Sequence, residues 1–547
     1  MPIDVNLIRE GRGGDVEAVR ASERKRNGSK PCTTVDDAIQ LDKEWRAILQ
    51  RSELVREEKN KVVAQVSSSA TKIPTPEQRE QSKALSLEIA KLEVELTAIA
   101  QRRDEAILKI GNVLHHSVPV ADKEEDLEEC TTSWGEFTSQ PGVVPHHQAL
   151  WMLGAYEPER GSSVAGHRGY YLKGCGVLLN QALINYALDF LIQREFEVVQ
   201  PPYFMTKNAM KKVSQLSDFE ESLYKLEGGD KDNEFFLIAT SEQPMCCFHQ
   251  NETLPLASLP IRYAGYSPCF RKEAGKFGVD TWGIFRVHQF DKVEQFIVCE
   301  PDSEQSFAML ERMRENAENF LKSLDLPFKT INVVSGELNL AAAKKYDINA
   351  WFPSLKAHKE LVSASNCLDY QSRATDTFTV DRDQQKKPVH LLNATLCALT
   401  RTICCIVENH QGERVLEDGT VQRGVHIPKI LLPYMRGVTF LPFVREERDF
   451  AQQKSAAKNG ASVAASKPKQ TKDTKKTKQN ETVVVGDAAE AQPPTKKAPA
   501  PVQAEKVVVA VAHKYTVEGC DYPTNIAALA GKNFASVAEY ITFLNTQ

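Results

Sequence analysis

The sequence predicts an α+β protein in which an antiparallel pair of long helices precedes a domain built on an antiparallel sheet. Three observations support this fold class: two helical heptad patterns near the N-terminus, a pair of strands with one strongly polar face in the middle, and a change in composition after Phe450. The 547 residues can hold two or three domains, each with its own core. A composition of 41% hydrophobic and 26% charged residues is that of an ordinary soluble protein.

Charge and cysteine content exclude several broad classes of protein. The net charge of -5 gives no overall attraction for nucleic acid, so an RNA contact would need local basic patches. The N-terminus carries charges where a signal peptide needs an apolar core, and we expect no membrane-spanning run, so the sequence predicts a cytoplasmic location without membrane contact. The cysteines contain no CxxC pair, which predicts reduced, mostly buried thiols rather than a zinc ribbon or a disulfide framework.

The two heptad patterns predict a helical hairpin. Apolar residues alternate in spacing between three and four over residues 34–66, and again over 85–113 after the polar break SSSATKIPTP. Two helices of similar length joined by a short turn predict an antiparallel coiled coil, each helix about 50 Å long. Thr33 or Thr34 and the run Thr75-Pro76-Glu77 are suited to begin the helices. By itself, such a hairpin is more typical of a dimerisation coil or of part of a helical bundle.

Residues 261–299 predict two strands joined by a glycine-containing loop. Because residues two apart on a strand share a face, Arg271 and Glu273 should point the same way at the end of the first strand. The corresponding face of the second strand carries Arg286, His288, Phe290, Lys292 and Glu294. These side chains suit phosphates, a base and an amine. A charged strand face is more often a solvated surface with ion pairs than a binding site. Here the opposite face of the strand is only partly apolar, so neither face is accounted for by core packing alone.

The run Phe270-Arg271-Lys272-Glu273, followed by a loop and by RVHQFDKVE over residues 286–294, resembles motif 2 of class II aminoacyl-tRNA synthetases in the form found in seryl-tRNA synthetases. The first four residues alone are a weak signature, whereas the whole run is highly specific. The resemblance covers roughly residues 1–440. It implies a class II synthetase sheet flanked by helices, preceded by a coiled-coil arm that grips the long variable arm of serine tRNA largely by shape and backbone contacts.

Further segments resemble this family in the family's order. Residues 171–200 predict a long helix leading into a strand that ends in proline, similar to motif 1, which forms the dimer interface of this class. A homodimer is therefore implied by resemblance alone. Thr240-Ser241-Glu242 resembles the loop that holds serine, although an isolated Thr-Ser-Glu more often caps a helix. Residues 358–373 resemble the strand that supplies metal and substrate ligands.

Residues 391–409 resemble motif 3, with Arg401 near the start of a buried helix. A lone arginine in an apolar helix is otherwise a structural ion pair. This chain has Leu396-Cys397-Ala398 where the family often has a glycine-containing step, which puts the local loop geometry in question more than the arginine.

The resemblance implies a role for each matching residue. Arg271 would bridge the serine carboxylate and the α-phosphate, and Arg401 would bind the γ-phosphate, so these two are the implied catalytic residues. The implied ATP-binding residues are Arg271, Glu273, Arg286, Val287, His288, Phe290, Glu360, Ser363 and Arg401. The implied serine-binding residues are Thr240, Glu242, Arg271, Glu294, Asn393 and Thr395. Glu360 and Ser363 stand at the Mg²⁺ positions, and two protein oxygen ligands suffice for a cation that keeps waters and phosphate oxygens.

Together these residues imply a serine–tRNA ligase that activates serine with ATP and transfers the seryl group to the 3′ end of serine tRNA. Whether it also charges selenocysteine tRNA with serine is left open. A catalytically silent relative that binds RNA or partners would lack one of Arg271, Glu294, Glu360 or Arg401, and all four are present. A synthetase for another amino acid would lack the N-terminal hairpin followed by TSEQP and VHQFDKVE.

The expected domain boundaries follow the same order. They are a tRNA-binding coiled-coil arm over residues 1–118, a linker over 119–150, a class II catalytic domain over 151–450, a disordered Lys/Ala/Pro-rich linker over 451–505, and a short C-terminal extension of unassigned role over 506–547. Lysines of the basic linker could add a salt-sensitive hold on RNA, and a solvated spacer is at least as consistent with the composition.

Overall fold

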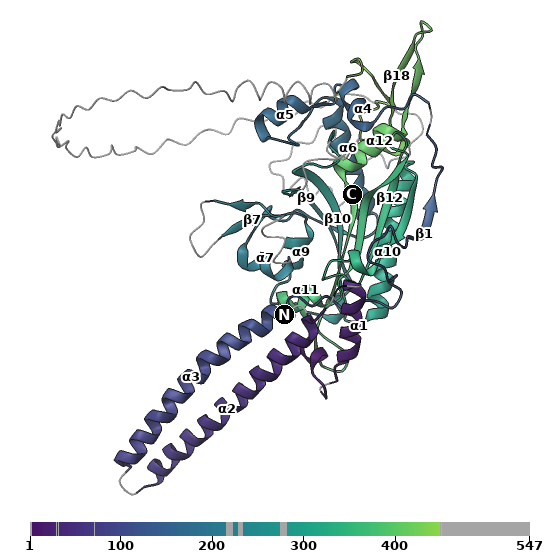
Figure 1. Cartoon of the computed structure of the whole chain (residues 1–547). Helices are drawn as coiled ribbons and strands as arrows, with labels where there is room; N and C mark the ends of the chain where they lie inside the picture. Colours follow the sequence, from purple (N-terminus) through teal and green to yellow (C-terminus); the bar gives the residue numbers. More distant parts are fainter. Residues whose placement is uncertain are drawn as a thin grey trace, which may run out of the picture. The chain divides into compact units, whose positions relative to one another are not determined.

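A computed structural model describes residues 3–450 apart from gaps at residues 12, 29, 31, 70–71, 140, 215–221, 228–233, 274–281 and 449. The architecture is α+β, as predicted, with a long helix pair and a large, mostly antiparallel sheet packed against helices (Figure 1). The predicted basic linker and C-terminal extension lie outside the described residues. So do residues 274–281, which are most of the loop predicted between the two strands of the motif 2 segment.

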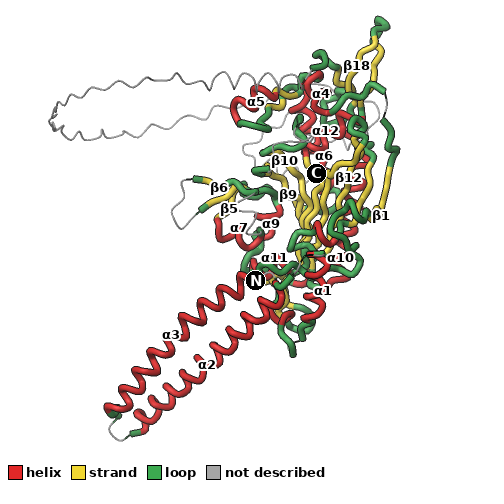
Figure 2. Tube along the Cα trace, in the orientation of Figure 1, coloured by secondary structure: helices red, strands yellow, loops and turns green. Residues whose placement is uncertain are grey.

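The arm consists of α2 (Thr34–Ser68) and α3 (Pro76–Ile107), which lie side by side (Figures 1 and 2). The predicted hairpin is confirmed, because apolar side chains from both helices form one buried seam. Its buried members are Val55, Val62, Leu85 and Leu92. α3 begins with a capping box, in which Thr75 and Gln78 each accept a hydrogen bond from the other's backbone N–H.

The base of the arm packs against the rest of the protein in a separate apolar cluster. α3 ends at Ile107, short of the predicted Val113, because the chain then turns into this cluster. Its buried members are Ile3, Ile8, Val19, Val35, Ala38, Ile107, Ile110 and Tyr370. Arg26 of α1 (Val16–Asn27) reinforces the contact by donating to the carbonyl oxygens of Asn112, Leu338, Asn339 and Ala342 at 2.6–3.4 Å.

An eight-stranded sheet forms the centre of the body. Its order is β1 (Glu129–Trp134), β11 (Phe328–Asn332), β12 (Lys344–Phe352), β13 (Ala357–Asn366), β16 (His390–Ala398), β10 (Gln289–Cys299), β9 (Ile261–Phe270) and β4 (Glu197–Val199). Neighbouring strands are antiparallel except β4 and β9, which are parallel.

Residues 119–150, expected as a linker, contribute to the body. β1 lies in this segment and forms one edge of the large sheet, and α4 (His146–Met152) packs into the main core. The polar run of β1 is compatible with a strand because an edge strand exposes much of its surface to water. The amino-acid composition of residues 119–150 is therefore similar to that of a linker, although the segment folds as part of the body.

Helices α6 (Cys175–Ile192), α10 (Ser303–Ser323) and α12 (Leu399–Asn409) contribute most of the helical core residues. Contrary to expectation, α6 is long and apolar enough to span a membrane by length and composition. The buried core helix of a soluble protein has the same length and apolar composition. Leu179, Leu183 and Leu191 of α6 are buried in the main core, so the apolar run is accounted for by packing.

Smaller elements surround the large sheet. The three-stranded sheets are β5 (Phe204–Thr206), β7 (Phe235–Leu237) and β6 (Lys225–Leu226); β15 (Lys386–Pro388), β14 (Phe378–Val380) and β8 (Thr253–Leu254); and β17 (Gln411–Val415), β18 (Val421–His426) and β19 (Phe440–Pro442). A two-stranded sheet pairs β2 (Tyr156–Glu157) with β3 (Tyr171–Leu172). The short helices are α5 (Pro158–Ala165), α7 (Lys207–Val213), α9 (Glu242–Cys246) and α11 (Tyr370–Thr375), with 3₁₀ turns at Val5–Ile8, Leu256–Ser258, Ser335–Glu337 and Lys429–Leu431.

The cysteines of the described residues are free thiols, and most of them are buried, as predicted. The buried ones are Cys246, Cys269, Cys299, Cys367, Cys397, Cys404 and Cys405.

Candidate active site

The candidate site is centred on the buried carboxylate of Glu294 in β10. Its Oε1 accepts a hydrogen bond from Lys292 Nζ at 2.7 Å. Its Oε2 accepts from Thr240 Oγ1 at 2.8 Å, Ser241 Oγ at 2.5 Å and the Glu242 amide at 3.0 Å. Burial acts to raise the pKa of Glu294, but Lys292 and the hydroxyl donors outweigh burial and hold the pKa below its usual value. Glu294 is therefore an anion at neutral pH.

A second carboxylate, that of Glu242 at the start of α9, lies close to Glu294. Glu242 Oε1 accepts a hydrogen bond from Gln371 Nε2 at 2.8 Å. Burial raises the pKa of Glu242 to about 7, and the negative charge of Glu294 adds to the rise. Two carboxylates beside the single ammonium of Lys292 suit a pocket that receives another amine.

β16, the neighbouring strand of the same sheet, adds two polar side chains beside Glu294. Thr395 stands directly opposite Glu294 in the strand register, and Asn393 lies two residues earlier on the same face. Both are 8% exposed. The register shifts between Val293 and Glu294 and leaves Leu396 without a partner on β10, which is a β-bulge. Leu396-Cys397-Ala398, which stands where the resembling family often has a glycine, therefore includes a β-bulge in this chain.

A neighbouring hollow is lined by three arginines from different parts of the chain. Its lining residues are Arg271, Glu273, Phe285, Arg286, Val287, Phe290, Thr400 and Arg401. Arg271, directly after β9, donates from Nε to the Ala239 carbonyl at 3.2 Å, and its guanidinium lies 5.2 Å from the centre of the Phe290 ring. Arg401, in the first turn of α12, lies 5.0 Å from the centre of the Phe285 ring. Guanidinium groups beside aromatic rings suit the phosphates and the base of a nucleotide.

Glu273 forms one side of the hollow in a strained backbone conformation. Its φ of 49° lies in the left-handed region, which residues other than glycine adopt at a cost. Two arginines hold it there: Arg286 Nε donates to Glu273 Oε2 at 2.5 Å, and Arg168 Nη1 donates to the Glu273 carbonyl at 3.3 Å. A strained backbone at Glu273, in a hollow lined by arginines, indicates that the Glu273 carboxylate is positioned to contact a ligand.

The prediction that Arg286 and His288 lie on the second strand is wrong. β10 begins at Gln289, which pairs with the last residue of β9, Phe270. The preceding segment departs from the sheet because Phe285 and Val287 are buried in the core. His288 still contacts the site, since its Nδ1 lies 2.9 Å from the Arg271 carbonyl oxygen and its own carbonyl accepts from the Arg271 amide at 2.9 Å.

Glu360 and Ser363 share a face of β13 although they are three residues apart. A register shift leaves Leu361 without a partner on β12, so that Glu360 lies opposite Asn349 and Ser363 lies opposite Asp347. Glu360 lies 3.7 Å from Arg401 Nη1. Burial acts to raise the pKa of Glu360, but the combined positive charges of Arg401, Lys345, Arg271 and Lys292 keep the pKa below its usual value.

This oxygen-bearing face fits a hard divalent cation. Asp347 Oδ1 and Asn349 Oδ1 are buried without a hydrogen-bond partner in the described part of the chain. No cluster of three or more His, Cys, Asp or Glu side chains that could hold a metal occurs among the described residues. The protein therefore offers a few oxygens rather than a complete cage, which is the arrangement that suits Mg²⁺ carrying waters and phosphate oxygens.

Two segments of the chain match known families. Residues 3–114 match the seryl-tRNA synthetase N-terminal domain, and residues 224–410 match the tRNA synthetase class II core domain (G, H, P, S and T). The cytoplasmic serine–tRNA ligase of Arabidopsis thaliana is 45% identical over 455 residues, which cover 81% of this chain and 96% of that protein. The chain belongs to the seryl-tRNA synthetase family.

Solved structures of seryl-tRNA synthetases resemble this fold closely. The cytoplasmic serine–tRNA ligase of Naegleria fowleri, solved in complex with AMP, matches with a TM-score of 0.71 at 40% identity, over 81% of this chain and 99% of that one. The seryl-tRNA synthetase of Pyrococcus horikoshii, solved with ATP, matches with a TM-score of 0.71 at 37% identity, over 81% of this chain and all of that one.

Sequence reasoning assigned no individual role to three residues of the site of this seryl-tRNA synthetase. Lys292 and Ser241 both contact Glu294, and their positions beside predicted residues in strand and turn could have identified them. Gln371 lies within the segment 358–373 that the resemblance singled out, but Glu242 is 129 residues away in the sequence and only folding brings the two together.

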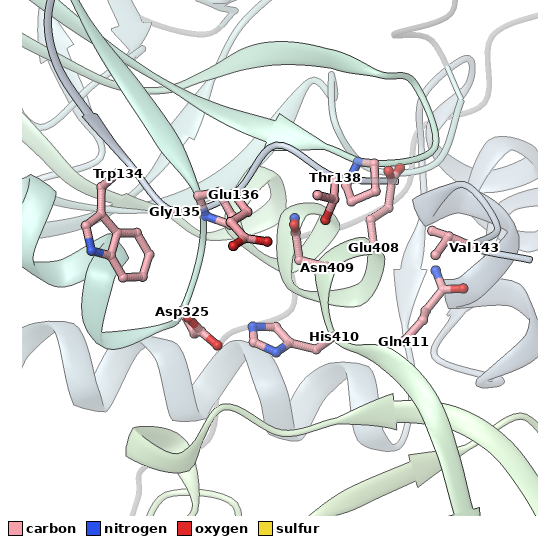
Figure 3. A pocket seen from close by; sticks show the side chains of 12 residues that line it. Trp134, Gly135, Glu136, Thr138, Val143, Asp325, Glu408, Asn409, His410 and Gln411 are labelled. Atoms are coloured by element: carbon pink, nitrogen blue, oxygen red, sulfur yellow. The ribbon is translucent and has the colours of Figure 1, made fainter. Parts of the chain in front are cut away.

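A larger hollow of the same seryl-tRNA synthetase fold lies elsewhere (Figure 3). It is lined in part by Trp134, Glu408 and Gln411. The polar groups of Glu408 and Gln411 are already bonded within the protein: Glu408 accepts from His146 and Ser354, and Gln411 exchanges hydrogen bonds with the Val144 backbone. With these groups satisfied internally, the hollow is a weaker candidate for catalysis than the arginine-lined one.

Proposed function

We propose that the chain is an ATP-dependent serine–tRNA ligase of the cytoplasm, which forms seryl-adenylate and then transfers the seryl group to the 3′ end of serine tRNA. The observation that carries the proposal is the buried Glu294 network directly beside the hollow lined by Arg271 and Arg401. An anionic pocket for an amine next to a cationic hollow for phosphates is what joining an amino acid to a nucleotide requires. Family membership and the names of the curated relatives support the same activity.

In the first step, a carboxylate oxygen of serine attacks the α-phosphorus of ATP. An O–P bond forms, the bond to the bridging oxygen of pyrophosphate breaks, and pyrophosphate leaves with that electron pair. No general base is needed for an ionised carboxylate, so the protein contributes positioning and charge stabilisation. Arg271 would hold the serine carboxylate and the α-phosphate, and Arg401 the γ-phosphate.

The remaining residues would orient the two substrates. Phe290 would stack on adenine while Glu273, held by Arg286, contacts the adenine amino group; Val287 and His288 would support this wall. Glu360 and Ser363 would hold Mg²⁺, which would neutralise charge on the ATP phosphates when bound.

Selectivity for serine would come from its amine and its hydroxyl. Thr240, Glu242 and Glu294 would receive the ammonium group, and Asn393 and Thr395 would line the hydroxyl end. A pocket that hydrogen-bonds a hydroxyl disfavours alanine strongly, because its buried polar groups would be left unpaired. Threonine would be excluded by size.

The arm would bind the long variable arm of serine tRNA. Its exposed arginines Arg51 and Arg56 are paired with Glu88 and Glu93, so recognition by shape is favoured over a purely electrostatic grip. In the second step, a ribose hydroxyl at the tRNA 3′ end would take the seryl group and release AMP. By family analogy the protein would act as a homodimer.

The test is amino-acid-dependent ATP–pyrophosphate exchange, measured with each of the twenty amino acids, Mg²⁺ and no tRNA. We expect exchange with serine and at least about 1,000-fold less with alanine. Absence of exchange with every amino acid, in a folded sample, would overturn the proposal. Charging assays with serine tRNA and selenocysteine tRNA would then define the RNA substrates.

A further inference from the structure

Gln371 makes a buried contact to one of the two pocket carboxylates. It is 3% exposed, and its Nε2 donates to Glu242 Oε1 at 2.8 Å. Its Oε1 is buried and has no hydrogen-bond partner in the part of the chain that the structure describes. Because the ionised carboxylate only accepts, the amide nitrogen is the atom that faces Glu242 in that form. The orientation of the Gln371 side chain is thus set by Glu242.

The short helix α11, which carries Gln371, is anchored to two other parts of the protein. Tyr370 donates from its hydroxyl to the Ile110 carbonyl at the arm base, at 3.0 Å. Ser372 Oγ donates to the Val389 carbonyl, directly before β16. These contacts, one on each side of Gln371, leave its backbone little freedom. The amide is therefore presented to Glu242 from a fixed position.

We propose that Gln371 is a positioning residue of the amino-acid pocket, which holds the Glu242 carboxylate in place to receive the ammonium group of the substrate. The inference rests on the proposed function, since it gives the pocket an amino-acid ligand. Among the described residues, Gln371 is the side chain that hydrogen-bonds the Glu242 carboxylate.

The charges around Glu242 make its protonation state depend on the contact with Gln371. The titratable groups that act on Glu242 come from several elements. They are Glu294 and Lys292 of β10, Arg271 after β9, Cys246 of α9 and Cys367 before α11. The helix α7 also packs against α9, and it carries Lys211 and Lys212. Burial and Glu294 raise the pKa of Glu242 to about 7, and the Gln371 hydrogen bond acts against that rise. Without the amide, Glu242 would keep its proton to a higher pH, and a protonated carboxyl cannot pair with an ammonium group.

The experiment replaces the amide by an apolar side chain of similar length, Gln371→Met. In serine-dependent pyrophosphate exchange, we expect the KM for serine to rise about 10-fold at pH 7, since hydrogen bonds to charged groups are the stronger kind. The increase should shrink at pH 8.5, where Glu242 ionises without help. The kcat and the KM for ATP should change less than about 2-fold.

Gln385→Met is the matched control, because it makes the same substitution at an exposed glutamine outside the pocket and leaves the anchors of α11 intact. It should leave the pH profile of the serine KM unchanged. If Gln371→Met does not fold, Gln371→Asn tests the same contact, since its amide is one methylene too short.

The outcomes separate the inference from the proposed function. A serine KM that is unchanged, that rises equally at all pH values, or that rises together with the KM for ATP would overturn the role of Gln371. If the unmodified protein shows no exchange with serine, the proposed function fails, and calorimetric titration with serine then decides the inference. Weaker binding by Gln371→Met than by the unmodified protein upholds it, whereas equal binding or no binding by either protein overturns it.

Discussion

The buried ion pair of Lys292 with Glu294 gives a sharp prediction about stability. Lys292 is 5% and Glu294 3% exposed, and their charged atoms lie 2.7 Å apart. Lys292→Met keeps the volume of the side chain but removes the ammonium, leaving a buried carboxylate with only hydroxyl and amide donors. Removing one partner of a buried ion pair costs about 3–5 kcal/mol of folding free energy. For a protein of this size, each kcal/mol lowers the Tm by about 2 °C, so we expect the Tm to fall by about 6–10 °C at pH 7.5.

The pH dependence of this loss has a defined sign. In the unmodified protein the pKa of Glu294 is lowered, so the carboxylate contributes stability above its unfolded pKa, and that contribution is lost as the pH falls through the folded pKa. Without Lys292, burial should raise the folded pKa of Glu294 above its unfolded value. The variant is then penalised most at neutral pH, and its Tm deficit should shrink toward pH 5 as Glu294 takes up a proton.

Thermal unfolding at pH 7.5 and pH 5 measures both effects. Lys429→Met is the matched control, since Lys429 is exposed, and it should shift the Tm by less than about 1 °C. The double variant Lys292→Met/Glu294→Gln should recover part of the loss because it also removes the unpaired charge of Glu294. A Lys292→Met variant as stable as the control, or a double variant that recovers nothing, would refute the reasoning.

Three further predictions concern activity. Arg271→Ala should lower serine-dependent pyrophosphate exchange by at least about 1,000-fold with little change in Tm, and normal exchange would contradict its assigned role. Glu360→Gln should raise the Mg²⁺ concentration for half-maximal exchange about 10-fold, and EDTA should abolish exchange reversibly; an unchanged Mg²⁺ requirement would place the cation elsewhere. Replacing residues 46–99 by a short Gly-Ser connection should spare exchange but abolish charging of serine tRNA. That replacement keeps the base of the arm, including the buried residues Val35 and Ile110, which a deletion of residues 35–112 would remove. Retained charging would show that the arm is dispensable.

The arm and the site strands were predictable because their signals are local. The heptad spacing and the Thr75 cap act within a few residues of the chain, and the predicted helix pair formed. Alternation along a strand likewise placed Lys292 and Glu294 on one face, and the structure puts them in contact. Local repetition of this kind is present in the sequence before any tertiary contact forms.

Other features depended on pairing between distant segments. The polar run of β1 resembles a linker until β11 supplies its partner, and the second site strand begins at Gln289 because the preceding residues pack into the core. Bulges at Leu361 and Leu396 exist only where two strands meet. They place Glu360 on the same face as Ser363, and Thr395 opposite Glu294.

The sequence by itself therefore determined the helical arm, the fold class and the residue types of the site, since periodicity and motif spacing are properties of neighbouring residues. Tertiary structure decided which strands pair, how bulges shift their register, and which buried groups hold one another. The Gln371 contact to Glu242 joins residues 129 positions apart, and only the complete fold brings them within hydrogen-bonding distance.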